Sequence, residues 1–256
     1  MILKQNGLLV LLVIGVSQAA LSAPEAVPQP TGAFSITMTP EELLGEAAEK
    51  TQSVIASDEQ IVWEAYVPKS YRADSPAGVV VYVSPSRSGA PPRGWASVMD
   101  DHNLIWISAN QSGNRVLAPR RVLKAILALE AIQQQYAIDD TRIYIAGFSG
   151  GGKVASMIAT EFATTFVGGI FICGVEFWDV DEPRYIEAIR SNRYVFLAGE
   201  RDQALEPTKR VYRSYRDAGV PNIKLVIVRG MGHSNPPRNE ISKAIEFLVT
   251  GANALR

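Results

Sequence analysis

Several residue types that mark particular classes of protein are scarce in this chain of 256 residues. The single cysteine, Cys173, cannot form an intramolecular disulfide, and one cysteine excludes a cysteine-rich zinc site. Two histidines are too few for a histidine-rich metal site. Lys+Arg 25 against Asp+Glu 26 leaves a net charge of -1, which gives no global field to attract nucleic acid or an anionic membrane. We therefore expect no metal, no organic cofactor and no nucleic-acid partner.

Apolar residues, in contrast, are plentiful. Hydrophobic residues make up 47% of the sequence and charged residues 20%, a balance that supports a packed core and argues against intrinsic disorder. The sequence contains no internal repeat and no low-complexity block. The composition indicates a globular protein, and a chain of this length has room for one or two domains.

The start of the chain has the pattern of a secretory signal peptide, which we assign to residues 1–19. A basic residue precedes a short apolar run from Gly7 to Val16, and small residues follow it. Ser17 and Ala19 fit the −3 and −1 positions, so cleavage is predicted after Ala19, with Ala23 as the second choice. A membrane anchor is the alternative, but the apolar run is about half the length that a spanning helix needs. The cleaved protein is expected to be secreted or periplasmic, with no stable membrane association.

Closely spaced prolines predict a tether over residues 24–40. At its end, Thr39 is a candidate helix N-cap, followed by Pro40 at the first helical position. The remaining residues, 41–256, are predicted to form a single domain.

Within this domain, strand patterns alternate with helix patterns. Short runs of β-branched or aromatic residues, most of them apolar on both faces, occupy residues 61–67, 78–83, 104–108, 142–146, 167–173, 194–198 and 223–228. Segments with helical periodicity occupy residues 119–136, 151–161, 183–190, 206–218 and 237–249. Strands that are apolar on both faces are typical of parallel sheets covered on both sides. The alternation therefore predicts an α/β fold with a mostly parallel, twisted sheet and helices on both faces.

A glycine-rich turn lies between one predicted strand and the next helix. Residues Gly147–Gly151 read G-x-S-x-G, the nucleophile elbow, in which a serine occupies a strained strand-to-helix turn. Residues 147–153 also fit most of a phosphate-binding loop, G-x-x-x-x-G-K. That motif continues with a hydroxyl residue that binds Mg²⁺, whereas this chain has Val154. The pattern favours a nucleophile at Ser149.

A serine nucleophile needs a base and an acid, and candidates follow in the expected chain order. Asp202 comes after the strand at 194–198, and His233 comes after the strand at 223–228. Both lie beyond the C-terminal end of a strand, the edge where open α/β sheets carry their sites. His233 would accept the Ser149 proton, and Asp202 would orient the imidazole. The alternative for His233 is a surface loop histidine, and the other candidate acids are Glu176, Asp179 and Glu200.

These motifs resemble those of the α/β-hydrolase superfamily over about residues 61–250. The residues that carry the resemblance are Gly147-Phe-Ser149-Gly-Gly, Leu197-Ala-Gly-Glu-Arg-Asp202 and Gly230-Met-Gly-His233. The compact chain, which has no insertion for a large cap domain, is similar to secreted esterases related to polyhydroxybutyrate depolymerases and feruloyl esterases. The resemblance implies an α/β-hydrolase fold without a large cap, and it favours an ester over an amide as substrate.

An enzyme of this kind stabilises the oxyanion with two backbone N–H groups. Gly150, directly after the nucleophile, would supply the first. The second would come from the loop after the strand at 78–83, which reads Ser84-Pro85 where many relatives have His-Gly. Ser86 is the candidate because proline has no N–H. The alternative is that this loop is only a turn.

Several loop residues are candidates for the substrate pocket. Trp95, Phe177 and Trp178 could form an aromatic wall, although core or surface packing accounts equally well for aromatic residues in loops. Arg87 and Arg93 could bind a substrate carboxylate, with solvated surface arginines as the alternative.

Together, these features predict a secreted serine hydrolase that cleaves a small-molecule or polymeric ester through an acyl-enzyme. A peptidase on the same scaffold is one alternative. A catalytically silent binding protein with this fold is another, because a fold by itself does not prove a function.

Overall fold

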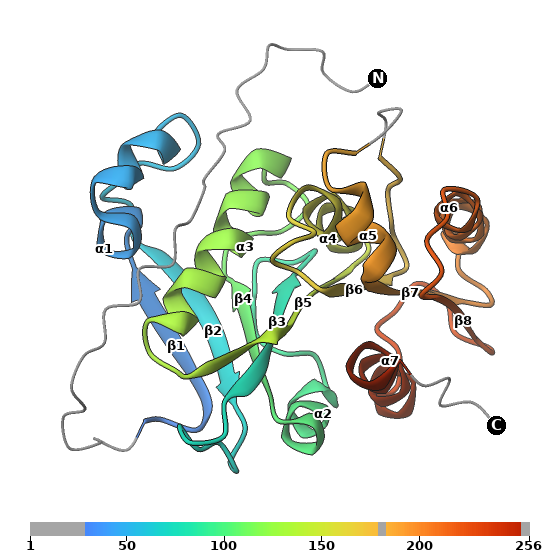
Figure 1. Cartoon of the computed structure of the whole chain (residues 1–256), viewed down its shortest axis with the longest axis horizontal. Coiled ribbons are helices and arrows are strands. Elements are labelled where there is room, and N and C mark those ends of the chain that lie inside the picture. Colours follow the sequence, from blue (N-terminus) through green and yellow to red (C-terminus); the bar gives the residue numbers. More distant parts are fainter. Residues whose placement is uncertain (1–28, 179–182, 252–256) are drawn as a thin grey trace.

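The structure is a computed structural model that describes residues 29–178 and 183–251. In this described part, an eight-stranded sheet has the order β1-β2-β4-β3-β5-β6-β7-β8 (Figure 1). β1 and β2 pair antiparallel, as do β2 and β4, and the remaining neighbours are parallel. The strands are β1 (Gly32–Met38), β2 (Ile61–Val67), β3 (Ala77–Val83), β4 (Leu104–Ala109), β5 (Ile138–Phe148), β6 (Gly168–Ile172), β7 (Arg193–Gly199) and β8 (Ile223–Val228).

The central strands are apolar on both faces because both faces are covered. In β3, Val79 and Val81 point into one core cluster, whereas Val80 and Tyr82 point into the other. Successive side chains of a strand point to opposite faces, so a strand packed on both sides must be apolar throughout. The predicted mostly parallel sheet with helices on both faces is confirmed.

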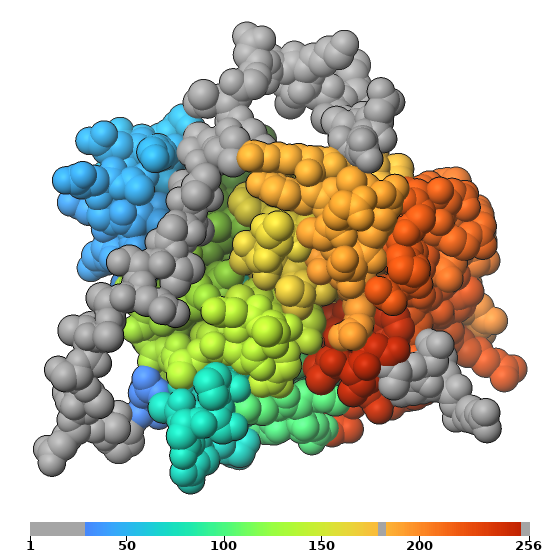
Figure 2. Space-filling model, in the orientation of Figure 1, coloured from blue at the N-terminus to red at the C-terminus, as the bar shows by residue number. Residues whose placement is uncertain are grey.

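The helices divide between the two faces of the sheet (Figure 1). One face carries α2 (Trp95–His102) and α7 (Arg238–Thr250). The other carries α1 (Pro40–Leu44), α3 (Ala118–Gln133), α4 (Gly150–Glu161), α5 (Ile186–Ser191) and α6 (Leu205–Asp217). Figure 2 shows the yellow-green to orange segments of α3, α4 and α5 adjoining one another on the surface. No helix in residues 29–178 or 183–251 is long and apolar enough to cross a membrane.

The short helix α1 begins as its sequence predicts. The Thr39 hydroxyl accepts a hydrogen bond from the Glu42 N–H, and the Glu42 carboxylate accepts one from the Thr39 N–H at 2.7 Å. This reciprocal arrangement is a capping box, with Pro40 at the first helical turn. A 3-10 helix at Gly45–Thr51 continues directly from α1.

Two elements differ from the prediction. The expected tether over residues 24–40 contains strand β1, in which Phe34 and Ile36 alternate with polar residues and pair with β2. Helix α2 was not predicted at all, because its eight residues are too few for a clear helical period. The predicted signal peptide at 1–19, its alternative cleavage site at Ala23 and the first part of the tether lie outside the described residues.

Candidate active site

Ser149 occupies a strained turn between β5 and α4. Its φ of 56° and ψ of -125° lie in a region that non-glycine residues rarely adopt. The Ser149 N–H donates to the Ile172 carbonyl at the end of β6, at 2.7 Å. This bond and the helix that starts at the next residue hold the serine at the C-terminal edge of the sheet.

The glycines on either side of Ser149 allow the tight approach that the turn requires. A Cβ atom at Gly147 would stand 2.4 Å from the Gly151 carbonyl oxygen. A Cβ atom at Gly151 would stand 1.9 Å from the Val83 carbonyl oxygen of β3. Both distances are well inside van der Waals contact, so larger residues would force the turn open. The G-x-S-x-G spacing is therefore a packing requirement of this turn.

The structure brings Ser149, His233 and Asp202 together in a hydrogen-bonded chain. The Ser149 Oγ lies 2.8 Å from His233 Nε2. On the other side of the ring, His233 Nδ1 lies 2.9 Å from Asp202 Oδ1 and 3.1 Å from Asp202 Oδ2. In the tautomer that this geometry favours, Nδ1–H donates to the carboxylate and the serine hydroxyl donates to Nε2. Phe148 packs against the imidazole with ring centroids 5.0 Å apart.

The loops that carry the acid and the histidine are tied to each other. The Glu200 carboxylate accepts the Gly230 N–H at 2.8 Å, and the Arg201 N–H donates to the Met231 carbonyl at 2.9 Å. Glu200 was an alternative candidate for the acid, and its carboxylate instead braces the histidine loop. Glu176, another alternative, forms an ion pair with Lys153 at 2.6 Å.

Asp179, the remaining alternative acid, lies outside the described residues.

The Asp202 carboxylate is buried and stays ionised. Its side chain is 0% exposed. Burial by itself would raise the pKa of Asp202, but hydrogen bonds from the Ala204 N–H, the Cys173 thiol and His233 lower the pKa below its ordinary value of 3.8. The Ala204 N–H donates at 2.8 Å. The environment therefore holds a negative charge next to His233 Nδ1.

Cys173 is a second neighbour of this carboxylate. Burial, and then the bond to Asp202, raise the pKa of the Cys173 thiol to about 12. The potential ligand atoms of Cys173, Asp202 and His233 lie within 4.8 Å of one another. A metal binds the thiolate rather than the thiol, and the imidazole Nδ1 is already bonded to the carboxylate. The arrangement fits a hydrogen-bonded chain better than a metal site.

The two predicted oxyanion donors, Gly150 and Ser86, differ in the hydrogen bonds of their N–H groups. Gly150 is the first residue of α4, so its N–H has no acceptor within the helix. The Ser86 N–H donates to the Ser84 hydroxyl within its own loop, at 3.2 Å. This bond is at the long end of the normal range. To serve as the second donor, the Ser86 N–H would have to exchange the Ser84 hydroxyl for the oxyanion.

A buried arginine joins the three segments on this side of the serine. Arg121 of α3 is 5% exposed, and its guanidinium donates to three backbone carbonyls. The acceptors are Ser112 at 2.8 Å, Gly150 at 3.1 Å and Ser84 at 3.1 Å. These residues belong to the loop after β4, the start of α4 and the loop after β3. Sequence analysis missed Arg121, since nothing in a helical pattern marks which arginine turns inward.

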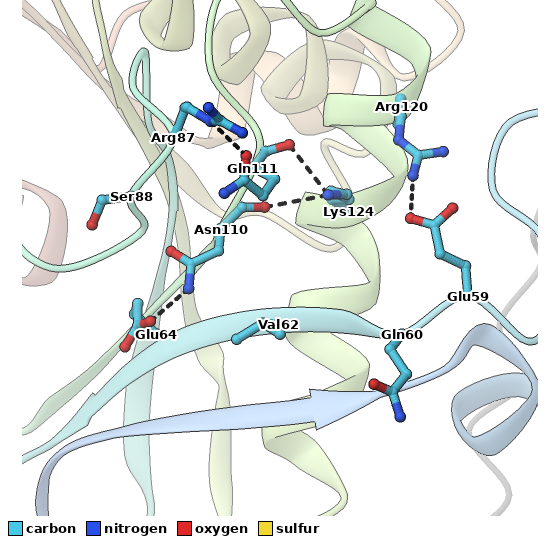
Figure 3. A pocket seen from close by; sticks show the side chains of 10 residues that line it. All are labelled: Glu59, Gln60, Val62, Glu64, Arg87, Ser88, Asn110, Gln111, Arg120 and Lys124. Carbon is cyan, nitrogen blue, oxygen red and sulfur yellow. Dashed lines mark hydrogen bonds and ion pairs between the residues drawn. The ribbon is translucent and has the colours of Figure 1, made fainter.

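Lys124 of α3 and Arg87 of the loop after β3 donate hydrogen bonds to the loop after β4 (Figure 3). Lys124 Nζ donates to the carbonyls of Asn110 and Gln111, both at 3.2 Å. Arg87 Nε donates to the Gln111 side chain at 2.8 Å. These residues line a polar hollow of about 620 Å³. In its lining, Arg120 forms an ion pair with Glu59, and the Glu64 carboxylate accepts a hydrogen bond from the Asn110 amide. These bonds tie the loop after β4 to its neighbours.

The predicted aromatic wall is not formed. Trp95 is 0% exposed and packs in α2 against Tyr82 and Trp106, with ring centroids 5.5 and 5.0 Å away. It is a core residue because a helix, rather than a loop, begins there. Phe177 and Trp178 lie half-buried against Tyr215 of α6 on the other face of the sheet.

A cavity that sequence analysis missed lies where the loop after β3 meets the loop after β4. We call it the β3–β4 cavity; its volume is about 560 Å³. One of its lining residues, Asn114, packs against the nucleophile turn, because a Cβ atom at Gly150 would stand 2.3 Å from Asn114 Oδ1. The lining residues are Pro85, Ser86, Arg87, Gln111, Gly113, Asn114, Arg115 and Val116.

Comparisons with known proteins identify the fold. No protein-family model matches the chain, and no curated protein matches it in sequence. A ferulic acid esterase superposes with a TM-score of 0.65 at 17% identity, over 86% of this chain and 98% of that one. The S-formylglutathione hydrolase of Staphylococcus aureus gives 0.63 at 13% identity, over 88% and 100%. The dipeptidyl peptidase 4 of Porphyromonas gingivalis gives 0.55 at 17% identity, over 75% and 33%.

This chain has the α/β-hydrolase fold. The predicted resemblance to that superfamily is confirmed at the level of the fold, and similar structures include the predicted feruloyl type of esterase. Among the described residues, no large cap domain separates consecutive strands, as expected. In this fold the C-terminal edge of the sheet carries the site, and Ser149, His233 and Asp202 meet at that edge.

Proposed function

We propose that this protein is a serine hydrolase that cleaves carboxylic esters through an acyl-enzyme on Ser149. The observation that carries the proposal is the hydrogen-bonded chain from Ser149 Oγ to His233 Nε2 at 2.8 Å and from His233 Nδ1 to Asp202 at 2.9 Å. A nucleophile bonded to a base, which is itself oriented by a buried carboxylate, is the arrangement that acyl transfer requires. The fold is shared with esterases of similar length.

In the first half of the proposed reaction, Ser149 Oγ attacks the ester carbonyl carbon while its proton passes to His233 Nε2. The carbonyl oxygen becomes an oxyanion in the tetrahedral intermediate. When the intermediate collapses, the bond to the alcohol breaks and His233 protonates the departing alkoxide. The acyl group is then bonded to Ser149 Oγ. Asp202 stabilises the positive imidazolium during this step.

In the second half, His233 takes a proton from a water molecule, which attacks the acyl-enzyme carbonyl. The bond between the acyl group and Ser149 Oγ breaks, the serine regains its proton from His233, and the carboxylic acid leaves. The oxyanion of both halves would accept hydrogen bonds from the N–H groups of Gly150 and Ser86. Loss of one such donor typically costs about 10²–10³ in rate.

Purified protein assayed on short-chain nitrophenyl esters tests the proposal. We expect turnover by the wild type and a loss of at least about 10³-fold in the variant Ser149→Ala, because no nucleophile remains. Ser214→Ala, the same substitution on α6 away from the site, is the matched control and should keep its activity. Equal turnover in Ser149→Ala and wild type would refute the mechanism, and no turnover in either would favour a silent binding protein.

A peptidase is the second candidate, favoured by the likeness of this chain to part of a dipeptidyl peptidase. That likeness covers 33% of the peptidase chain, so most of that enzyme has no counterpart here. Cleavage of aminoacyl nitroanilides faster than of the matched esters would establish the peptidase instead.

We further propose that the chain is exported and cleaved after Ala19, with Ala23 as the second choice. The support is the basic start, short apolar run and small residues at the N-terminus. N-terminal sequencing of protein recovered from the periplasm or medium of the expressing cell should begin at Ala20. Protein that keeps Met1 and stays in the cytoplasm would contradict export.

A further inference from the structure

We propose that the β3–β4 cavity binds the acyl group of the substrate, and that this acyl group carries a negative charge recognised by Arg87 and Arg115. The inference rests on the ester-hydrolase function proposed above. It names a substrate class: esters of acids in which an apolar chain or ring separates the ester from a second anionic group, such as a carboxylate.

The position of the cavity assigns it to the acyl side of the ester. His233 protonates the leaving alcohol, so the alcohol must lie toward His233. The cavity is instead lined by Ser86 and by Asn114, which contacts Gly150, and none of its lining residues comes from the loops of Asp202 and His233. The part of the substrate that points away from the histidine is the acyl group.

The walls of the cavity favour an apolar body. Pro85, Gly113 and Val116 contribute a mostly apolar lining, together with the aliphatic stems of the arginines. A volume of about 560 Å³ lies within the range of pockets that bind small molecules. An acyl chain or an aromatic ring would bury its apolar surface here.

The charge of the cavity is positive and uncompensated. Arg87 and Arg115 line it, and no acidic residue does. Among the described residues, neither arginine forms an ion pair with a carboxylate, and the Nε–H of Arg87 is bonded to the neutral amide of Gln111 (Figure 3). The remaining guanidinium N–H groups are donors that suit the oxygens of a carboxylate. In a chain with a net charge of -1, this local excess is not a general property of the surface.

Two nitrophenyl esters of equal acyl length test the inference. One ends in a methyl group, and the other ends in a carboxylate. We expect wild-type protein to have the higher kcat/KM for the carboxylate-ended ester, after subtraction of the rate in Ser149→Ala. The double variant Arg87→Met/Arg115→Met should lower the ratio of the two kcat/KM values by about tenfold, with each single variant giving part of that change.

Arg93→Met is the matched control, because Arg93 is an exposed arginine of the loop after β3 that does not line the cavity. In Arg93→Met, the ratio of the two kcat/KM values should stay within about twofold of the wild-type ratio. The wild-type preference should also weaken as salt rises, since exposed charges are screened. The methyl-ended ester reports in every variant how much folded, active enzyme is present.

The outcomes separate the two proposals. If neither ester is turned over above the Ser149→Ala rate, the ester-hydrolase function itself fails. If the methyl-ended ester is hydrolysed but the carboxylate-ended ester is not preferred, only the inference fails. It also fails if the preference survives in the double variant, or if Arg93→Met removes the preference as fully as the double variant does.

Discussion

At the scale of single residues, the proposed chemistry depends on the ionised carboxylate of Asp202, which is hydrogen-bonded to the imidazole of His233. Chain order and motif placed Ser149, His233 and Asp202 among the candidates, and the structure brings these three together. What the sequence could not decide was the role of each nearby acid. Glu200 and Asp202 are two residues apart, and only the folded loop shows that Glu200 holds Gly230 while Asp202 faces the histidine.

The pH dependence of activity follows from the low pKa of Asp202. A carboxyl group whose pKa is lowered stays ionised as the pH falls toward its ordinary value of 3.8. Protonation of Asp202 should therefore lower activity only below pH 3.8. We expect the profile of kcat/KM against pH, measured with a neutral ester, to show no loss from protonation of Asp202 above pH 3.8.

Replacing the Asp202 carboxylate by a neutral amide should lower kcat strongly, although the two side chains have nearly the same shape. In Asp202→Asn the amide favours the wrong tautomer of His233, so kcat should fall by about 10³–10⁴-fold. Glu200→Gln is the matched control, since its amide oxygen can still accept the Gly230 N–H, and its activity should stay within about tenfold of wild type. A smaller loss in Asp202→Asn than in Glu200→Gln would reverse the assignment.

Arg121 is expected to stabilise the folded protein. Its guanidinium is the donor for three buried carbonyls, and methionine would leave those acceptors without it. We expect Arg121→Met to lower the free energy of unfolding by about 2–4 kcal/mol, measured by urea denaturation. Arg120→Met on the same helix is the control; its partners, the Glu59 carboxylate and the Val54 carbonyl, are only partly buried, so the loss should be about 1 kcal/mol. Equal losses would mean that the carbonyl contacts add little.

At the scale of elements, strands were easier to predict than the segments that depend on their neighbours. The run of β3 is apolar throughout and that of β4 is apolar apart from Ser108, and such a run is enough to predict a buried parallel strand. Strand β1 carries polar residues between its apolar ones and is stabilised by pairing with β2. Helix α2 is short and is stabilised by the packing of Trp95 against Tyr82. The β3–β4 cavity was missed for a similar reason, since Asn114 meets Gly150 only when the sheet forms.

A buried tyrosine makes the attachment of α2 sensitive to alkaline pH. The Tyr66 hydroxyl of β2 donates to Asp100 of α2 at 2.7 Å. Burial, and then the bond to this carboxylate, raise the pKa of Tyr66 from 10.0 to about 12. Its contribution to stability is therefore fully present below pH 10.0 and is lost as the pH rises toward about 12.

Tyr66→Phe tests this attachment. The variant should be less stable than wild type near neutral pH, and the difference in the free energy of unfolding should shrink between pH 10.0 and about 12. Urea denaturation at several pH values measures it. A difference that stays constant across that range would show that the hydroxyl does not hold α2 to the sheet.

At the scale of the whole molecule, the C-terminal edge of the sheet brings together residues that lie far apart in the sequence. Loops after β3, β4, β5, β7 and β8 all reach the C-terminal edge, and they bring together residues separated by up to 149 positions, from Ser84 to His233. The fold could be predicted because the alternation of strand and helix patterns and the order of the motifs are visible in the sequence itself. The substrate cavity could not, because it depends on which loop side chains turn toward one another.

The proposed reaction requires that Ser149 carries the acyl group during turnover. Mass spectrometry of protein quenched with acid during hydrolysis of an aryl ester tests it most directly. We expect a mass increase equal to one acyl group, located on the peptide that contains Ser149 and missing in Ser149→Ala. An acyl group on another residue, or sustained turnover by Ser149→Ala, would contradict it.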